Sequence, residues 1–306
     1  MRNLKILVLG CGGQVGWELR HRLACMGEVI GVDFPKVDFS NADSIRKTVR
    51  EVAPAVMVNA AAYTAVDKAE SETELAMAIN GTAPGVLAEE AKRLGCVLVH
   101  YSTDYVFDGT KLGPYVETDA PHPLNVYGRS KLAGDEAIEA VGGNYLILRT
   151  SWVYGARGNN FLLTMLRLAK EKTELRIVDD QIGSPTTSEC IAQATADILA
   201  QVLAPVGGGL HGRSGIYNLT CTGETSWFGF AKEFLNERSG SATPKLIPIP
   251  TSEFPRPAKR PANSRLLCRR VEETFGVRMP DWKVALALVL ETLREGSSLT
   301  QGNLES

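Results

Sequence analysis

A glycine-rich turn lies directly between an apolar run and a helical pattern near the start of the chain. The apolar run covers 6–10, and a helix is predicted over 14–24. Glycines lack a Cβ atom, so backbone N–H groups in such a turn can approach a pyrophosphate at the positive end of the helix. The strand–turn–helix context therefore predicts a dinucleotide site formed by Gly10, Gly12, Gly13, Gln14, Val15 and Gly16.

Short apolar runs alternate with helical patterns through the first half of the chain. Runs at 29–33, 56–59 and 97–102 are separated by helical patterns at 43–52 and 75–94. This alternation predicts an α/β fold of the Rossmann type, with a doubly wound parallel sheet. The runs are apolar throughout, as expected for strands that helices cover on both faces.

The rhythm becomes less regular after Trp152, where helical patterns are separated by Pro- and Gly-rich connections. We expect an NAD(P)-binding domain over 1–151 and a smaller α/β lobe, mainly for substrate binding, over 152–295. Some segments of this lobe are expected to return to the main sheet. A disordered tail is expected over 296–306.

Composition places the 306-residue chain among ordinary globular proteins and argues against two kinds of partner. A formal net charge of -2 and dispersed Lys and Arg residues argue against nucleic-acid binding. The first ten residues hold too short an apolar run for a secretory signal or a membrane span, which predicts a cytoplasmic protein with no membrane contact. Cysteine and histidine spacings indicate no zinc site.

An acidic residue, Asp33, ends the second apolar run about twenty residues after the glycine turn. A carboxylate at that place accepts hydrogen bonds from the adenosine ribose, which favours NADH. Lys36 lies close enough in sequence to meet a 2′-phosphate, so NADH and NADPH both remain open. The cofactor is further expected to contact Asp38 and Phe39 around the adenine, and Ala62, Tyr63 and Thr64 after the third run.

Tyr127 and Lys131 stand four residues apart in a predicted helix and therefore share one of its faces. A neighbouring ammonium favours the phenolate and should lower the tyrosine pKa from its ordinary value near ~10. Thr103 follows the fourth apolar run, at the sheet edge where open α/β folds bind ligands, and its hydroxyl can polarise a carbonyl. Thr103, Tyr127 and Lys131 therefore predict the catalytic group of a nicotinamide-dependent carbonyl reductase, in which Tyr127 and Lys131 also contact the cofactor.

Longer sequence runs carry a more specific pattern, at 58–70, 100–107, 124–128, 149–154, 158–161 and 260–265. Together they resemble the dTDP-4-dehydrorhamnose reductase family of the extended short-chain dehydrogenase/reductase superfamily, over nearly the whole chain. The resemblance implies reduction of the C4 ketone of dTDP-4-dehydro-L-rhamnose to dTDP-L-rhamnose by NADH or NADPH.

The same resemblance implies roles for individual residues. Tyr127 would donate the proton, Lys131 would hold the nicotinamide ribose, and Thr103 would hydrogen-bond the sugar oxygen. The nucleotide-sugar substrate would also contact Asp104, Trp152, Arg260 and Asn263.

Some members of this family are dimers in which interface glutamates hold a divalent metal. Glu18, Glu189 and Glu291 are the candidates for this role, and Mg²⁺ prefers such oxygen ligands. The resemblance thus leaves open a homodimer with a structural Mg²⁺. No metal is expected in catalysis, because hydride transfer to a ketone does not require one here.

Two alternatives remain at this point. The first is another nucleotide-sugar enzyme on the same scaffold, either a reductase or an epimerase. A dehydratase is less favoured because Asp104 is the single carboxylate beside Thr103. The second is a non-catalytic nucleotide-binding protein that regulates a partner, against which the joint presence of Thr103, Tyr127 and Lys131 argues.

Overall fold

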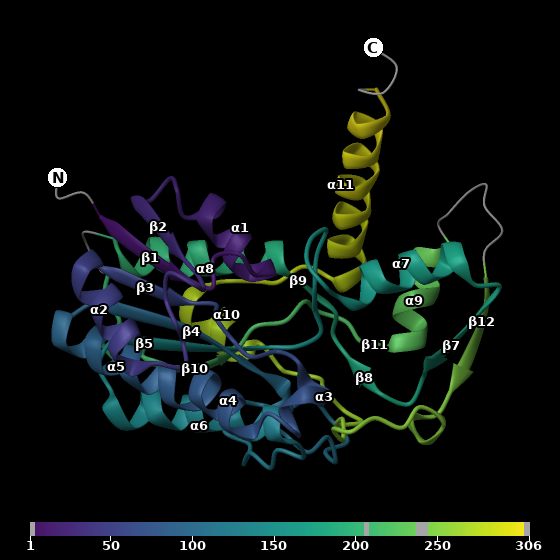
Figure 1. Ribbon diagram of the computed structural model, residues 1–306, viewed down its shortest axis with the longest axis horizontal. Coiled ribbons are helices and arrows are strands. Elements are labelled where there is room, and N and C mark those ends of the chain that lie inside the picture. Colours follow the sequence, from purple (N-terminus) through teal and green to yellow (C-terminus); the bar gives the residue numbers. More distant parts are fainter. Residues whose placement is uncertain (1–3, 205–207, 237–243, 303–306) are drawn as a thin grey trace.

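A computed structural model describes residues 4–204, 208–236 and 244–302. Its centre is a six-stranded, fully parallel sheet with the strand order β10-β5-β4-β3-β1-β2 (Figure 1). The strands are β1 (Lys5–Leu9), β2 (Glu28–Val32), β3 (Val56–Asn59), β4 (Val97–Thr103), β5 (Tyr145–Thr150) and β10 (Gly215–Asn218). The predicted α/β class with a doubly wound parallel sheet is confirmed.

Helices cover both faces of this sheet (Figure 1). Because successive side chains of a strand point to opposite faces, Ile6 and Val8 of β1 enter one core cluster while Leu7 and Leu9 enter the other. One face carries α1 (Gln14–Arg22) and α8 (Ser188–Val202), which pack against each other. The other face carries α2 (Ala42–Val52), α5 (Ala83–Leu94) and α6 (Val126–Val141).

Side chains and glycines at the helix ends explain where these helices begin and stop. The Asn125 side chain accepts the Gly128 N–H at 2.7 Å and starts α6. Gly95, at φ +68°, ends α5. The long helix predicted over 75–94 is divided into α4 (Thr73–Met77), a π-helical turn η1 (Ala78–Thr82) and α5, with Pro84, which lacks an N–H, just after the π turn.

A second lobe lies beside the carboxyl ends of the strands (Figure 1). Its small parallel sheet pairs β7 (Glu174–Val178) with β12 (Lys245–Ile249), against which α9 (Trp227–Asn236) packs. The remaining elements are α3 (Val66–Ala69), η2 (Asp104–Val106), β6 (Val153–Tyr154), α7 (Phe161–Glu171), β8 (Ile182–Gly183), β9 (Thr186–Thr187), β11 (Thr225–Ser226), η3 (Thr251–Glu253), α10 (Arg269–Phe275) and α11 (Trp282–Gly302).

Helix α11 continues to Gly302 and projects away from the rest of the molecule (Figure 1). This differs from the sequence prediction of a disordered tail from 296, of which 303–306 lie outside the described residues. The helix is anchored by the buried residues Trp282, Leu286 and Val289. The continuation contains no proline, and of its two glycines only Gly296 lies inside the helix, where a glycine costs about 1 kcal/mol.

In the part of the chain that the structure describes, no helix is both long enough and apolar enough to cross a bilayer.

A buried ion pair fastens α6 to the sheet. The Arg149 guanidinium of β5 lies 3.2 Å from the Asp135 carboxylate of α6, and both side chains are almost completely buried. The Ser102 hydroxyl of β4 donates to the same carboxylate at 2.8 Å. Burial raises the pKa of Asp135, while Arg149 and, more weakly, Lys131 lower it. The net effect is a raised pKa, which these partners reduce only in part.

We expect Arg149→Met to lower the free energy of unfolding by about 3 kcal/mol, because it leaves a buried carboxylate without its cation. Urea denaturation measures this loss. The matched control is Arg167→Met, which breaks the exposed pair with Glu171 on α7 and should cost less than about 1 kcal/mol. Equal losses in the two variants would contradict a special role for the buried pair.

Candidate active site

The candidate site lies at the carboxyl ends of β1, β2, β3 and β4. The chain runs outward from β1 to β2 and then returns to place β3 on the other side of β1. Open α/β sheets bind ligands at such a reversal of strand order. The glycine turn, Asp33, the segment after β3 and Thr103 all follow these strands, so the topology brings them to one edge.

The glycine turn is shaped for a close approach of backbone to ligand. Gly10 has φ +76°, and a Cβ atom there would lie 2.5 Å from the Ala61 backbone nitrogen. A Cβ atom at Gly16 would overlap the Gly10 carbonyl oxygen. Helix α1 has Gly13 at its N-cap and no side chain capping it, so the N–H groups of its first turn are open to an anion. These features fit the pyrophosphate of a dinucleotide.

Asp33, directly after β2, joins the glycine turn to the end of that strand by a hydrogen bond. Its carboxylate accepts hydrogen bonds from the Gly12 N–H at 2.8 Å and the Phe34 N–H at 2.9 Å. Lys36 is exposed nearby. The carboxylate of Asp38 accepts from the backbone N–H and the hydroxyl of Ser40, and Phe39 belongs to the core between the sheet and its helices.

Gln14 and Val15 connect the turn to its surroundings. The Gln14 side-chain oxygen accepts from the Asn160 amide at 2.9 Å, which joins α1 to the segment before α7. Val15 packs against the core on the α1 side of the sheet.

The segment containing Ala62, Tyr63 and Thr64 is fixed by the π-helical turn. The Asn80 side chain accepts from the Tyr63 N–H at 2.8 Å and donates to its carbonyl at 3.0 Å. The Tyr63 hydroxyl donates to Glu72 at 2.5 Å, and this hydrogen bond raises the pKa of Tyr63 to about 12. The Tyr63 and Tyr127 side chains pack in one small apolar cluster. The segment after β3 therefore meets the start of α6.

Thr103, Tyr127 and Lys131 come together where β4 ends. The Thr103 hydroxyl donates to Asp104 at 3.0 Å and also hydrogen-bonds Tyr127. Lys131 is buried, and its Nζ donates to the Tyr101 carbonyl at 2.6 Å. The Tyr105 ring packs edge-on against Tyr127, with 5.6 Å between centroids.

Burial governs the acidities of this group. It raises the pKa of Tyr127 to about 12, and the hydrogen bond with Thr103 offsets only part of the rise. It also lowers the pKa of Lys131 to about 8, against the opposing effect of Asp135. The sequence predicts a lowered tyrosine pKa, and the structure shows the opposite. The Lys131 amine turns toward β4, and desolvation disfavours both charged forms.

The neighbouring carboxyl of Asp104 is also buried. Burial raises its pKa to about 7, while contacts with the Ser264 and Thr103 hydroxyls lower it in part. This carboxyl therefore changes its protonation state near neutral pH, directly beside the Thr103 hydroxyl.

The other three residues predicted to contact substrate each interact with a different part of the protein. Trp152 has φ +49° and stacks on Trp227, with 3.6 Å between ring centroids. Arg260 forms a two-pronged ion pair with Asp67 of α3, with both N···O distances at 3.0 Å. The Asn263 amide donates to the carbonyls of residues 111 and 113, so it holds that loop in place.

A cavity of about 460 Å³ opens between Arg260 and the second lobe. Its lining combines aromatic rings with four cations: Phe161, Trp227, Phe254, Arg176, Arg256, Lys259 and Arg260. The sequence pattern finds the cluster around Arg260 but misses Arg176, Phe161 and Trp227, because these residues come from distant elements.

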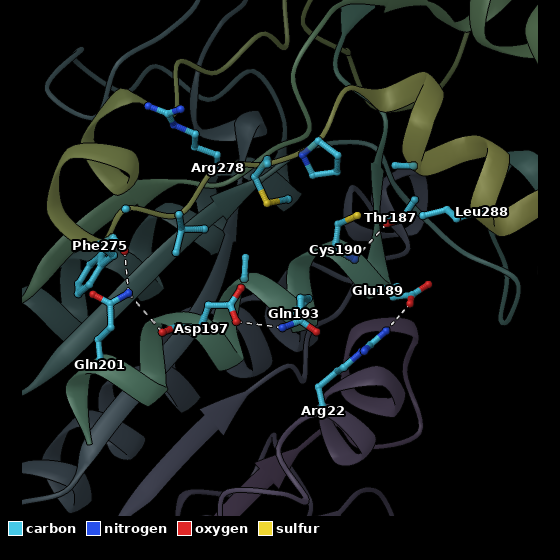
Figure 2. A pocket seen from close by; sticks show the side chains of 16 residues that line it. Arg22, Thr187, Glu189, Cys190, Gln193, Asp197, Gln201, Phe275, Arg278 and Leu288 are labelled. Carbon is cyan, nitrogen blue, oxygen red and sulfur yellow. Dashed lines mark hydrogen bonds and ion pairs between the residues drawn. The ribbon is translucent and has the colours of Figure 1, made fainter. Parts of the chain in front are cut away.

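The three glutamates considered for Mg²⁺ do not come together as one group of metal ligands within the described chain. Glu18 lies near Glu189, and burial followed by this like charge raises the pKa of Glu18. Glu189 forms an ion pair with Arg22 beside a second cavity, of about 590 Å³ (Figure 2). Glu291 is exposed on α11. Across the described ranges, no group of three or more His, Cys, Asp or Glu side chains could hold a metal ion, so Mg²⁺ is not supported.

Sequence patterns miss four side chains that contact the predicted site residues. They are Asn59 and His100 behind Lys131, Asp67 on Arg260, and Tyr105 on Tyr127. Each stands inside a run used for strand assignment or family resemblance. No periodicity distinguishes such a residue from its neighbours.

Comparisons with known proteins agree with this geometry. The chain is 48% identical to the dTDP-4-dehydrorhamnose reductase of Burkholderia thailandensis, over 95% of this chain and 99% of the relative. It is 44% identical to the enzyme of the same name from Escherichia coli K12, over 95% and 98% of the two chains. A dTDP-4-dehydrorhamnose reductase of Bacillus anthracis, solved in complex with NADP, superposes with a TM-score of 0.87 at 33% identity, over 95% of this chain and 100% of that one.

A model of the family described as "RmlD substrate binding domain" matches residues 4–295. Together with the similarity to reductases over nearly their whole length, this match shows that the chain belongs to the RmlD substrate binding domain family, the family of the dTDP-4-dehydrorhamnose reductases.

Proposed function

We propose that this chain reduces the C4 ketone of dTDP-4-dehydro-L-rhamnose to dTDP-L-rhamnose with NADH or NADPH. The observation that carries the proposal is the meeting of Thr103, Tyr127 and Lys131 at the end of β4, beside a turn that fits a dinucleotide. The names of the relatives support the substrate, and the NADP complex of the Bacillus anthracis relative supports the cofactor.

A reduced nicotinamide, when bound, supplies the hydride that the ketone carbon accepts. Tyr127 gives a proton to the ketone oxygen, and its pKa of about 12 keeps it a protonated phenol at neutral pH. The Thr103 hydroxyl hydrogen-bonds the same oxygen and stabilises its developing charge. The Lys131 ammonium offsets the negative charge left on Tyr127. Each residue thus acts in the protonation state that reduction requires.

The cavity beside Arg260 suits the nucleotide half of the substrate. Arg176, Arg256, Lys259 and Arg260 offset the charge of a diphosphate, and Asp67 holds the Arg260 guanidinium in one orientation. Aromatic rings of the lining offer a stacking surface for thymine. The stacked pair of Trp152 and Trp227 forms the apolar wall toward the sugar.

The direct test mixes the purified protein with dTDP-4-dehydro-L-rhamnose and follows the loss of reduced-nicotinamide absorbance. Cofactor oxidation coupled to dTDP-L-rhamnose formation supports the proposal. Two alternatives have different signatures: an epimerase retains NAD through purification, and a regulatory protein binds cofactor without turnover. The homodimer and the cytoplasmic location stay predictions from the sequence.

We expect Tyr127→Phe to lower kcat by about 10³-fold, because the variant keeps the ring but has no proton to donate. Cofactor affinity, measured by fluorescence titration, should remain unchanged. Tyr145→Phe is the matched control, since Tyr145 begins β5 at the far end of the strand and should retain full activity. A fully active Tyr127→Phe enzyme would rule out the proposed proton donor.

The pH dependence of kcat/KM should follow the deprotonation of the Lys131 ammonium. Reduction requires the ammonium, whose pKa is lowered to about 8, so activity should be present below that pH and fall as pH rises through it. Tyr127 remains protonated over the same range, because its pKa is about 12. Steady-state rates at constant ionic strength measure the profile. Activity that stays level to pH ~10, near the ordinary lysine pKa, would be inconsistent with this assignment.

Cofactor preference should depend on Asp33 and Lys36 in opposite ways. Asp33→Ala removes an acceptor for the ribose hydroxyls and should raise the Kd for NADH about tenfold, with a smaller effect on NADPH. Lys36→Ala, its paired control, should weaken NADPH alone. Calorimetric titration of each variant with both cofactors measures these changes, and parallel losses for the two cofactors in either variant would contradict the assignment.

A further inference from the structure

Behind the proposed catalytic residues lies a buried line of three polar side chains. Asn59 of β3 and His100 of β4 are paired in register, and Lys131 of α6 lies beyond His100. The His100 Nδ1 is 3.0 Å from the Asn59 amide nitrogen, and its Nε2 is 3.1 Å from the Lys131 Nζ. All three residues are at most 2% exposed, so water cannot easily substitute for a missing partner. One imidazole ring therefore stands between two nitrogen groups that both ordinarily donate.

For the orientation of the Asn59 amide in this structure, the hydrogen-bond count places the imidazole proton on one nitrogen. Burial, followed by the charge of Lys131, places the pKa of His100 far below its ordinary value, so the ring is neutral and has one donor and one acceptor. The Asn59 carbonyl oxygen accepts from the Ala61 N–H at 3.2 Å, which turns the Asn59 amino group toward His100. In this orientation of Asn59, Nδ1 accepts from its amino group and the proton belongs on Nε2.

An Nε2–H group faces Lys131 in this arrangement. An ammonium has three donors and no lone pair, so it cannot accept this hydrogen bond. A neutral amine can accept it while still donating to the Tyr101 carbonyl. The arrangement thus belongs to the deprotonated form of Lys131. The ammonium requires the other tautomer, with the proton on Nδ1 and the Asn59 carbonyl turned toward it.

We propose that His100 is a positioning residue whose tautomer follows the protonation state of Lys131, and that Asn59 transmits this change to Ala61 in the cofactor site. The proton balance is simple. When the Lys131 and His100 pair loses one proton, the ammonium passes a proton to Nε2 and Nδ1 releases its own. The role in turnover rests on the proposed reductase function, whereas the tautomer change does not.

The hydrogen bond between Asn59 and the Ala61 N–H connects the tautomer change of His100 to the glycine turn of the cofactor site. The Ala61 N–H loses its bond to Asn59 when the amide turns, and the same nitrogen is the atom that would lie nearest to a Cβ placed on Gly10. Two other charged groups lie near Lys131. Asp135, on the same helix, raises the pKa of Lys131, and Arg149 of β5 forms an ion pair with the Asp135 carboxylate. Neither Asp135 nor Arg149 is hydrogen-bonded to His100 in the described structure, so the tautomer responds to Lys131 and Asn59.

Nitrogen-15 NMR of the histidine rings tests the tautomer without any substrate. The chain has four histidines, and the loss of one signal in His100→Gln assigns His100. We expect the proton to reside on Nδ1 below about pH 8 and on Nε2 above it, because the pKa of Lys131 lies there. A tautomer that does not change between pH ~6 and ~10, a range spanning the shifted and ordinary lysine values, would overturn the proposal.

The isosteric variant Asn59→Asp tests the role in turnover. Its two carboxylate oxygens can accept from the Ala61 N–H and from His100 Nδ1–H together, which fixes the tautomer that the ammonium requires. We expect the alkaline limb of kcat/KM to move upward by about one pH unit. His100 should then keep its proton on Nδ1 throughout the NMR titration.

The double variant Asn59→Asp with His100→Gln separates this effect from direct attraction between the new carboxylate and Lys131. If the tautomer transmits the effect, the upward shift disappears without the imidazole. A shift of equal size in the double variant would overturn the proposed link.

Should Asn59→Asp fail to fold, the NMR titration of the unmodified protein still decides the tautomer. Absent turnover with an intact tautomer change would count against the reductase function alone.

Discussion

The buried ion pair between Asp135 and Arg149 is the interaction on which the site geometry depends. It joins α6 to β5, and the Ser102 hydroxyl joins the same carboxylate to β4. The helix that carries Tyr127 and Lys131 is thereby held against the strand that ends in Thr103. Such a pair is costly to desolvate, so its value lies in fixing one arrangement of helix and sheet.

The same burial sets the acid–base chemistry. It raises the pKa of Tyr127 and Asp104 and lowers that of Lys131, because each shift favours the uncharged form. Reduction needs a neutral phenol but a charged ammonium, so burial helps one residue and opposes the other. Asp135 partly restores the charge on Lys131. The site is consequently a compromise between exclusion of water and retention of one cation.

The two lobes meet through charge as well as packing. Asp67, on the short helix after the cofactor segment, holds Arg260 from the opposite lobe. Tyr105 also hydrogen-bonds Arg260 and packs on Tyr127. Contacts from the nucleotide cavity to the proposed proton donor are therefore continuous. They pass through side chains that stand far apart in the sequence.

Features that depend on local spacing can be predicted from the sequence. These are the parallel sheet, from alternating apolar runs and helices, the glycine turn, and the grouping of Thr103, Tyr127 and Lys131, which lie on one strand end and one helix face. The side chains that partner with these residues become known only from the folded arrangement. It turned Lys131 toward His100, raised the pKa of Tyr127, and used Asn263 to hold a loop. The reason is physical: burial and long-range pairing depend on elements that the fold brings together, and no local pattern records them.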